Sequence, residues 1–108
     1  MPRQIRDLDI DGVGERLTWI RERANLSMSK LCKLSDITEG TVNRIELGTS
    51  RPSALSLFKI CRALGACPYW LAFGEGRPPS CKTMMYAVAT AWFEYTKTDE
   101  YKRRNDHD

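Results

Sequence analysis

The chain has 108 residues, of which 42% are hydrophobic and 29% are charged, and its formal net charge is +3. This length suits one domain with at most a small appended element, which argues against a two-domain enzyme. The composition excludes collagen-like and fully disordered proteins, and the longest nearly apolar stretches, 66–73 and 84–93, are too short for a membrane-spanning helix of about 20 residues.

The cysteine and histidine pattern limits the chemistry that the chain can perform. The four cysteines form no Cys-x-x-Cys pair, and the only histidine is the penultimate residue, His107. These residues fit neither a disulfide framework nor a common zinc site, and no histidine-dependent catalysis is expected. Because a phosphate-binding loop is also missing from the sequence, we predict a protein that is not an enzyme and needs no metal or cofactor. The N-terminal residues contain no apolar run of signal-peptide length, so we expect a cytoplasmic protein.

The positive charge is concentrated in one part of the sequence. Between Gly14 and Gly74, nine basic residues stand against five acidic ones, whereas 1–13 is slightly acidic and 75–108 is balanced. A mild basic excess of this kind permits nucleic-acid binding without establishing it.

Apolar residues recur at helical spacing from position 13 and predict a first amphipathic helix that ends near Asn25. Asp11 is a candidate N-cap for this helix. Residues 7–12 copy the opening of an EF-hand loop, but Thr18 stands where the last calcium ligand should be, and the preceding helix is missing. We therefore expect these acids to complement the start of the helix and not to bind calcium.

Two short helices are predicted next, joined by a turn at 35–38. Ser27 is positioned to cap the second helix and Thr38 to cap the third. The third helix should end at Gly48, because a residue without a Cβ suits the left-handed conformation that terminates helices. The apolar residues that should turn the third helix toward the core are Val42 and Ile45.

The remaining predicted elements are three helices separated by short breaks. Ser53 should cap a fourth helix that ends at Gly65, and Pro68 should open a short fifth helix. Segment 74–80 is rich in glycine and proline and predicts a linker. A sixth amphipathic helix follows over 82–98, and the charged tail 99–108 is expected to fray.

Two short helices joined by a tight turn, the second of which exposes small polar residues, form a helix-turn-helix arrangement. Residues 31–48 resemble this motif in the phage-repressor and Cro-like (XRE) family of transcription regulators. Flanking residues also resemble parts of the family. Gly14-Glu15-Arg16-Leu17 and Ile20-Arg21 resemble its first helix, and Glu46-Leu47-Gly48 resembles its E-x-G signature. Pro52-Ser53, Ala63-Leu64-Gly65 and Trp70-Leu71 resemble its fourth and fifth helices.

The resemblance implies an all-α fold, with a five-helix lambda-repressor-like helix-turn-helix domain plus one C-terminal amphipathic helix. The domain boundaries that we predict are an N-terminal arm at 1–11, the DNA-binding domain at 12–76, a linker at 77–81, a C-terminal helix at 82–98 and a charged tail at 99–108. The implied function is that of a sequence-specific regulator of transcription that binds double-stranded DNA, as a dimeric repressor of phage or mobile-element type.

The third helix supplies the candidate DNA base contacts, because anchoring it through its apolar residues leaves its other faces free to enter a major groove. Arg44 suits guanine and Asn43 suits adenine, and the resemblance also implies base contacts for Glu39 and Gly40. The full set of candidate base contacts is Glu39, Gly40, Thr41, Asn43 and Arg44. The candidate phosphate contacts are Ser27, Lys30, Lys33, Thr38, Thr49, Ser50 and Arg51. The alternative for the basic members of the second set is that they only solubilise the surface.

The resemblance also implies a partly buried ion pair between Arg21 and Glu46, which would be structural. Cys32 and Cys61 stand where the family has small core residues, so we expect buried, reduced thiols.

Three departures from the family leave the DNA sequence preference open. Met28 stands in place of a phosphate-binding glutamine. Asp36 replaces a turn glycine, which is tolerable because aspartate enters the left-handed region more readily than most residues. Gly40 weakens the third helix by about 1 kcal/mol relative to alanine.

The sixth helix is too apolar for a solvated tail, and it either packs on its own domain or joins two copies of the chain. Our candidates for dimerisation contacts are Met85, Val88, Trp92 and Tyr95. Within the regulator class, a restriction-modification controller or an antitoxin remains open. The rival from another class is a protein-interaction module that no longer reads DNA and binds a partner through this helix.

Overall fold

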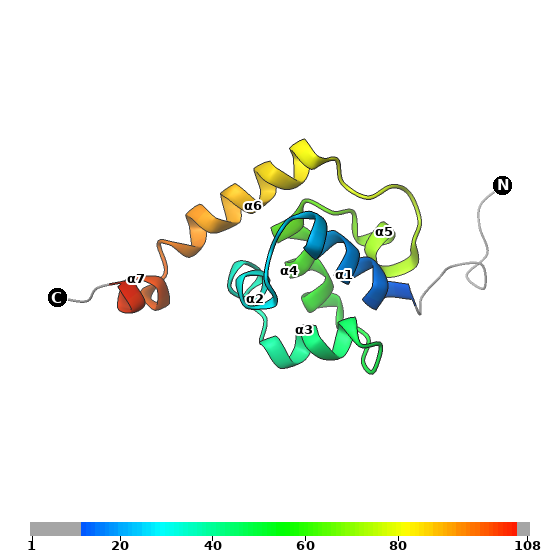
Figure 1. Cartoon of the computed structure of the whole chain (residues 1–108), viewed down its shortest axis with the longest axis horizontal. Helices are drawn as coiled ribbons and strands as arrows, with labels where there is room; N and C mark the ends of the chain where they lie inside the picture. The colour runs from blue at the N-terminus through cyan, green and yellow to red at the C-terminus, as the bar shows by residue number, and fades with distance from the viewer. Residues whose placement is uncertain (1–11, 106–108) are drawn as a thin grey trace.

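The computed structural model describes residues 12–105, and in this range the chain forms seven α-helices and no strand (Figure 1). In chain order the helices are α1 (Val13–Arg23), α2 (Met28–Ser35), α3 (Glu39–Glu46), α4 (Ala54–Leu64), α5 (Pro68–Phe73), α6 (Cys81–Tyr95) and α7 (Asp99–Asn105). The predicted all-α fold is therefore confirmed. None of these helices is long and apolar enough to cross a membrane.

Local capping signals set the starts of the helices much as the sequence predicts. The hydroxyls of Ser27, Thr38 and Ser53 each accept a hydrogen bond from the backbone N–H three residues later, at 3.1–3.3 Å. The start of α1 differs, because Gly12 occupies the N-cap position without a side-chain bond. The predicted cap, Asp11, and the calcium-like segment lie outside the described residues.

The first five helices enclose one apolar core. The largest side chains that are less than 2% exposed come from every helix of this bundle: Leu17, Ile20, Leu31, Val42, Ile45, Ile60, Leu64 and Leu71. The two inward residues predicted for the third helix are among them. Burial of these side chains is the main source of free energy that holds the short helices together, because helices of eight residues are not stable alone.

Gly14 allows α1 and α3 to touch. A Cβ on Gly14 would overlap the carbonyl oxygen of Ile45 and would lie 3.0 Å from that of Glu46. Real Cβ atoms do not approach backbone oxygens so closely, so any other residue at position 14 would push the two helices apart.

Helix α6 runs along one side of the bundle and packs against α2 and α4 (Figure 1). Its inner face carries Met84 and Tyr95, which are 3% and 7% exposed, and the half-buried Val88. Gly65 at the end of α4 has a left-handed φ of +69°, and a Cβ there would meet Thr83 of α6 at 3.1 Å. The C-terminal helix thus docks on its own domain in this structure.

The prediction of a frayed tail from residue 99 was wrong, because α7 forms there. Thr98 caps this helix by accepting a hydrogen bond from the Tyr101 N–H at 3.2 Å. The Tyr101 ring also stacks edge-on against Trp92 and Tyr95, with ring centroids 6.1 and 5.7 Å apart. A cap and two aromatic contacts stabilise a helix that its charged sequence does not predict.

Candidate nucleic-acid interface

Helices α2 and α3 meet through a short turn that has the geometry of a helix-turn-helix motif. The turn begins at Asp36, which adopts a left-handed conformation with φ 59° and ψ 50°. Thr38 then caps α3, and the Ile37 N–H donates to the carbonyl oxygen of Cys32 at 3.1 Å. The turn is short and hydrogen-bonded, so the orientation of α3 relative to α2 is well defined.

Helix α3 is anchored on one side and free on the other. Val42 and Ile45 are 0% and 1% exposed, whereas four of the five candidate base contacts are exposed: Glu39, Gly40, Asn43 and Arg44. The fifth candidate, Thr41, is half-buried. A bare helix face of this kind has the size and the polar groups to enter a DNA major groove.

A chain of side-chain contacts runs along the exposed face of α3. The hydroxyls of Thr38 and Thr41 are 2.9 Å apart, and the guanidinium of Arg44 lies 3.5 Å from the Thr41 hydroxyl. A Cβ on Gly40 would meet only the Arg44 guanidinium, at 3.4 Å. The Arg44 side chain therefore lies along this face, and the face leaves room for a close approach of another molecule.

Most candidate phosphate contacts fall near the two ends of the motif, whereas Thr38 caps α3 in the turn between the two helices. At the start of α2, Ser27 uses its oxygen as a cap, so its hydroxyl hydrogen is left to donate. After α3, the Thr49 hydroxyl donates to the carbonyl oxygen of Arg44 at 3.2 Å, and the exposed residues Ser50 and Arg51 continue the same loop. Lys33 is half-buried on α2.

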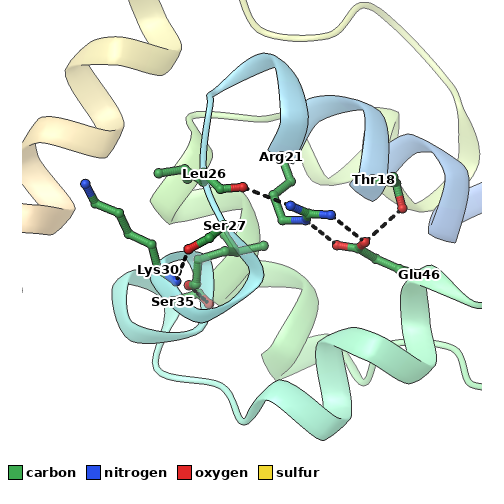
Figure 2. A network of polar contacts seen from close by, with 8 residues as sticks. Thr18, Arg21, Leu26, Ser27, Lys30, Ser35 and Glu46 are labelled. Atoms are coloured by element: carbon green, nitrogen blue, oxygen red, sulfur yellow. Dashed lines mark hydrogen bonds and ion pairs between the residues drawn. The ribbon is translucent and has the colours of Figure 1, made fainter.

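Lys30 is the one candidate phosphate contact that the structure directs elsewhere. Figure 2 shows its side chain extending from α2 toward α6. There its ammonium lies 4.8 Å from the centroid of the Trp92 ring, a cation–π contact. In the described structure, the Lys30 ammonium therefore takes part in the contact between α2 and α6.

A buried ion pair fixes the end of α3 to α1 (Figure 2). The Nε and Nη2 atoms of Arg21 donate to the two carboxylate oxygens of Glu46 at 2.7 and 3.1 Å, and Nη1 donates to the carbonyl oxygen of Leu26 at 2.9 Å. The exposed fractions of the two side chains are only 15% and 8%. The hydrogen bond to Glu46 raises the pKa of Arg21, as a charge-assisted bond should.

Two residues at this site were missed by sequence reasoning. The Thr18 hydroxyl donates to Glu46 at 3.0 Å, and the position of Thr18, three residues before Arg21 on α1, is the signal that could have revealed it. Leu47 caps the end of α3 and is 68% exposed. It lies seven residues after Gly40 and three after Arg44, so helical spacing places it on the same exposed stripe.

The two cysteines expected in the core are buried there. Cys32 and Cys61 are 7% and 4% exposed. Burial raises the pKa of the Cys32 thiol to about 11 and that of the Cys61 thiol to about 12. Both thiols stay protonated at neutral pH, and a protonated thiol is a poor nucleophile.

The structure separates the four candidate dimerisation contacts. Val88 and Tyr95 face the bundle, and Trp92 is partly covered by Lys30, Tyr95 and Tyr101. Only Met85, at 70% exposure, points clear of its own chain. In this conformation Val88 and Tyr95 are turned toward their own chain, which helical spacing alone does not show. Their role as contacts to a second copy stays a prediction.

A different apolar surface lies on α4 and α5. Leu55, Phe58 and Tyr69 are 65%, 57% and 66% exposed. Beside them is a hollow of about 250 Å³ lined by Leu57, Phe58, Pro68, Tyr69, Ala72 and Phe73. Exposed apolar patches of this kind mark protein–protein contacts more often than solvated surface. We define Leu55, Phe58 and Tyr69 as the α4–α5 patch.

Comparison with known proteins gives one family and two relatives. Residues 17–69 match the model of a helix-turn-helix family. The HTH-type transcriptional regulator DicA of Escherichia coli is 30% identical over 63 residues, which cover 58% of this chain and 47% of DicA. The HTH-type transcriptional regulator PrtR of Pseudomonas aeruginosa is 31% identical over 68 residues, 63% of this chain and 26% of PrtR. The chain thus spans less than half of each of these relatives, and no solved structure gives a significant match.

Proposed function

We propose that the chain is a transcriptional regulator of the phage-repressor and Cro-like type that binds double-stranded DNA, because its residues 17–69 match the model of a helix-turn-helix family and two HTH-type transcriptional regulators are similar to it. The observation that carries the proposal is the exposed face of α3. This helix is held by two buried side chains and one buried ion pair, while its polar residues and the guanidinium of Arg44 remain accessible. The two relatives are themselves transcriptional regulators.

The roles of the site residues follow from their positions. We assign base contacts to the exposed residues of α3, with Arg44 first, because a guanidinium can donate two hydrogen bonds to one guanine. We assign phosphate contacts to Ser27, Lys33 and the loop 49–51, which flank α3 at both ends. Arg21 and Glu46 hold the orientation of α3 and do not contact DNA.

We further propose that the regulator is a dimeric repressor of phage or mobile-element type. One motif contacts one half-site, and regulators of this architecture bind two half-sites about 34 Å apart as two-fold dimers. We assign the dimer contact to the α4–α5 patch, whose three large side chains are exposed, and treat α6, which exposes Met85, Tyr86 and Phe93, as the alternative surface. The α4–α5 patch begins at Leu55, four residues after Arg51, so pairing there would keep both copies of the loop 49–51 near one duplex.

The test of DNA binding starts from selection. Duplexes of about 30 base pairs with random centres would be selected on the purified full chain, and binding of the recovered duplex would be followed by fluorescence anisotropy at two salt concentrations. We expect saturable binding that survives unrelated competitor DNA and weakens steeply with salt, because phosphate contacts release counterions. Failure to bind any duplex at low salt would contradict the proposal and favour the protein-interaction module.

The test of the dimer uses sedimentation equilibrium. Phe58→Glu places a charge in the α4–α5 patch, and Met85→Glu places the same charge on the outer face of α6, at a residue of similar exposure. We expect only Phe58→Glu to yield a monomer. Dissociation by Met85→Glu alone would assign the dimer contact to α6, and a monomeric unmodified chain would contradict the dimer.

A further inference from the structure

A groove lies between the end of α1, the start of α2 and one side of α6, away from α3. Its volume is about 500 Å³, within the range of small-molecule sites in proteins. The residues that line it are Arg23, Ala24, Asn25, Lys30, Cys81, Met84, Met85, Val88, Ala89 and Trp92. We refer to it as the α1–α6 groove.

The walls of the α1–α6 groove on the side of α6 are apolar. Met84, Val88 and Trp92 recur every four residues along the helix, with Ala89 beside them, and the Trp92 ring closes one end of the groove. Met84 is 3% exposed, so the base of the groove is a buried methionine. Methionine side chains adapt their shape to different apolar ligands.

Two cations border this apolar surface. The Arg23 guanidinium lies 3.5 Å from the Cys81 sulfur and 5.3 Å from the centroid of the Trp19 ring. The Lys30 ammonium lies 4.8 Å from the centroid of the Trp92 ring. Neither cation has a carboxylate partner within the described residues, and no aspartate or glutamate lines the groove. The partners of both cations are aromatic faces and a thiol, which leave their charge uncompensated.

We propose that the α1–α6 groove binds a small organic acid with an apolar body and one carboxylate. The apolar body would lie on the side chains of α6, and the carboxylate would pair with the cation at one end of the groove, either Arg23 beside Cys81 or Lys30 beside Trp92. This arrangement gives a bordering cation a carboxylate partner and covers apolar surface in one step, whereas a neutral apolar molecule would leave both cations without such a partner. The charge and the lining together define the chemical class of the ligand.

The test uses octanoate as the probe and octanol as its uncharged counterpart, both at concentrations below aggregation. Binding to the full chain would be measured by calorimetry and by NMR of the methionine methyl groups. We expect the methyl signals of Met84 and Met85 to shift in a saturable way, while that of Met28, outside the groove, stays in place. Octanol should bind at least tenfold more weakly than octanoate.

Charge variants give the matched comparison. The double variant Arg23→Gln with Lys30→Gln should weaken octanoate binding at least tenfold and leave octanol binding unchanged. Lys82→Gln removes an exposed cation of α6 that does not line the groove, and it should have no effect. Equal binding of octanoate and octanol, or equal loss in the Lys82→Gln variant, would contradict a carboxylate site. The measurement contains no DNA, so its outcome is independent of the proposed regulator function.

Discussion

The carboxylate of Glu46 accepts two hydrogen bonds from the guanidinium of Arg21 across the contact between α3 and α1. The pair lies at the last residue of the helix that we assign to base recognition, and it is one of the few polar contacts between α1 and α3. It therefore affects both the stability of the bundle and the orientation of α3.

Breaking this buried pair should destabilise the fold strongly. Glu46→Ala leaves the Arg21 guanidinium without its charged partner, and we expect a loss of about 3 kcal/mol in the free energy of unfolding. Glu94→Ala is the matched control, because Glu94 pairs with Arg62 at 2.8 Å but both side chains are more than half exposed. The control should lose less than about 1 kcal/mol in the same urea titration. Equal losses in the two variants would contradict the structural role of Glu46.

Replacing Gly14 and Gly40 one at a time by alanine should change the free energy of unfolding in opposite directions. Gly14→Ala forces a Cβ into the backbone of α3, and we expect a loss of about 3 kcal/mol or more, since overpacking against backbone cannot relax through a side chain. Gly40→Ala adds a Cβ that meets only the flexible Arg44 guanidinium, at 3.4 Å, on an exposed helix, and it should raise the free energy of unfolding by about 0.5–1 kcal/mol. Thermal unfolding of the two variants beside the unmodified chain decides this, and a stable Gly14→Ala would refute the close contact.

The four thiols should divide into two pairs by reactivity. Cys67 and Cys81 are exposed, whereas Cys32 and Cys61 are buried and have raised pKa values. We expect iodoacetamide at pH 8 to modify two thiols per native chain and four in urea, as counted by mass spectrometry. Rapid modification of Cys32 or Cys61 in the native chain would speak against a closed core.

The same pKa shifts predict a loss of stability in alkaline solution. An unfolded thiol ionises near pH 8.5, but the native Cys61 thiol does so only at about pH 12. The contribution of the protonated Cys61 thiol to the free energy of unfolding is complete below pH 8.5 and declines as the pH rises toward 12. At pH 10 the decline is about 2 kcal/mol for this thiol. Urea unfolding at pH 7.5 and pH 10 should show a smaller decline for Cys61→Ala than for the unmodified chain. An identical decline would show that this thiol does not contribute.

Base and phosphate contacts should respond differently to mutation. Arg44→Ala should weaken the free energy of binding to the selected duplex by about 1–3 kcal/mol and relax the sequence preference at one base-pair position. Lys33→Ala should weaken all duplexes about equally and lower the salt dependence by about one phosphate contact. Anisotropy titrations at several salt concentrations separate the two patterns. A loss of affinity for Arg44→Ala that is equal on all duplexes would reassign Arg44 from the base contacts to the phosphate contacts.

The features that the sequence predicts well are those that depend on near neighbours. Ser27, Thr38 and Ser53 each cap a helix by accepting a hydrogen bond from the backbone N–H three residues later. Gly65 ends α4 in a left-handed conformation, so each of these signals acts within one helical turn. The ion pair at the end of α3 joins residues that are 25 positions apart. Its prediction came from family resemblance and not from local chemistry.

The features that could not be predicted are long-range contacts of the C-terminal part. The sequence does not decide which face of α6 is turned inward, because both faces of this helix are apolar. Only its contact with α2 and α4 shows the inner face. Helix α7 depends on the rings of Trp92 and Tyr95, and the ammonium of Lys30 lies over a ring 62 positions later in the chain. Periodicity within one segment contains no information about such partners.

The contact between Lys30 and Trp92 links two parts of the chain thermodynamically. Lys30 belongs to the first helix of the helix-turn-helix motif, but its charge stabilises the docked C-terminal helix. A duplex whose phosphates attract this ammonium would compete with Trp92 for it. Because linkage is reciprocal, docking of α6 would then weaken duplex binding by the same factor by which the duplex favours release of α6. In the proposed regulator, this one lysine would make the C-terminal helix a negative effector of DNA binding.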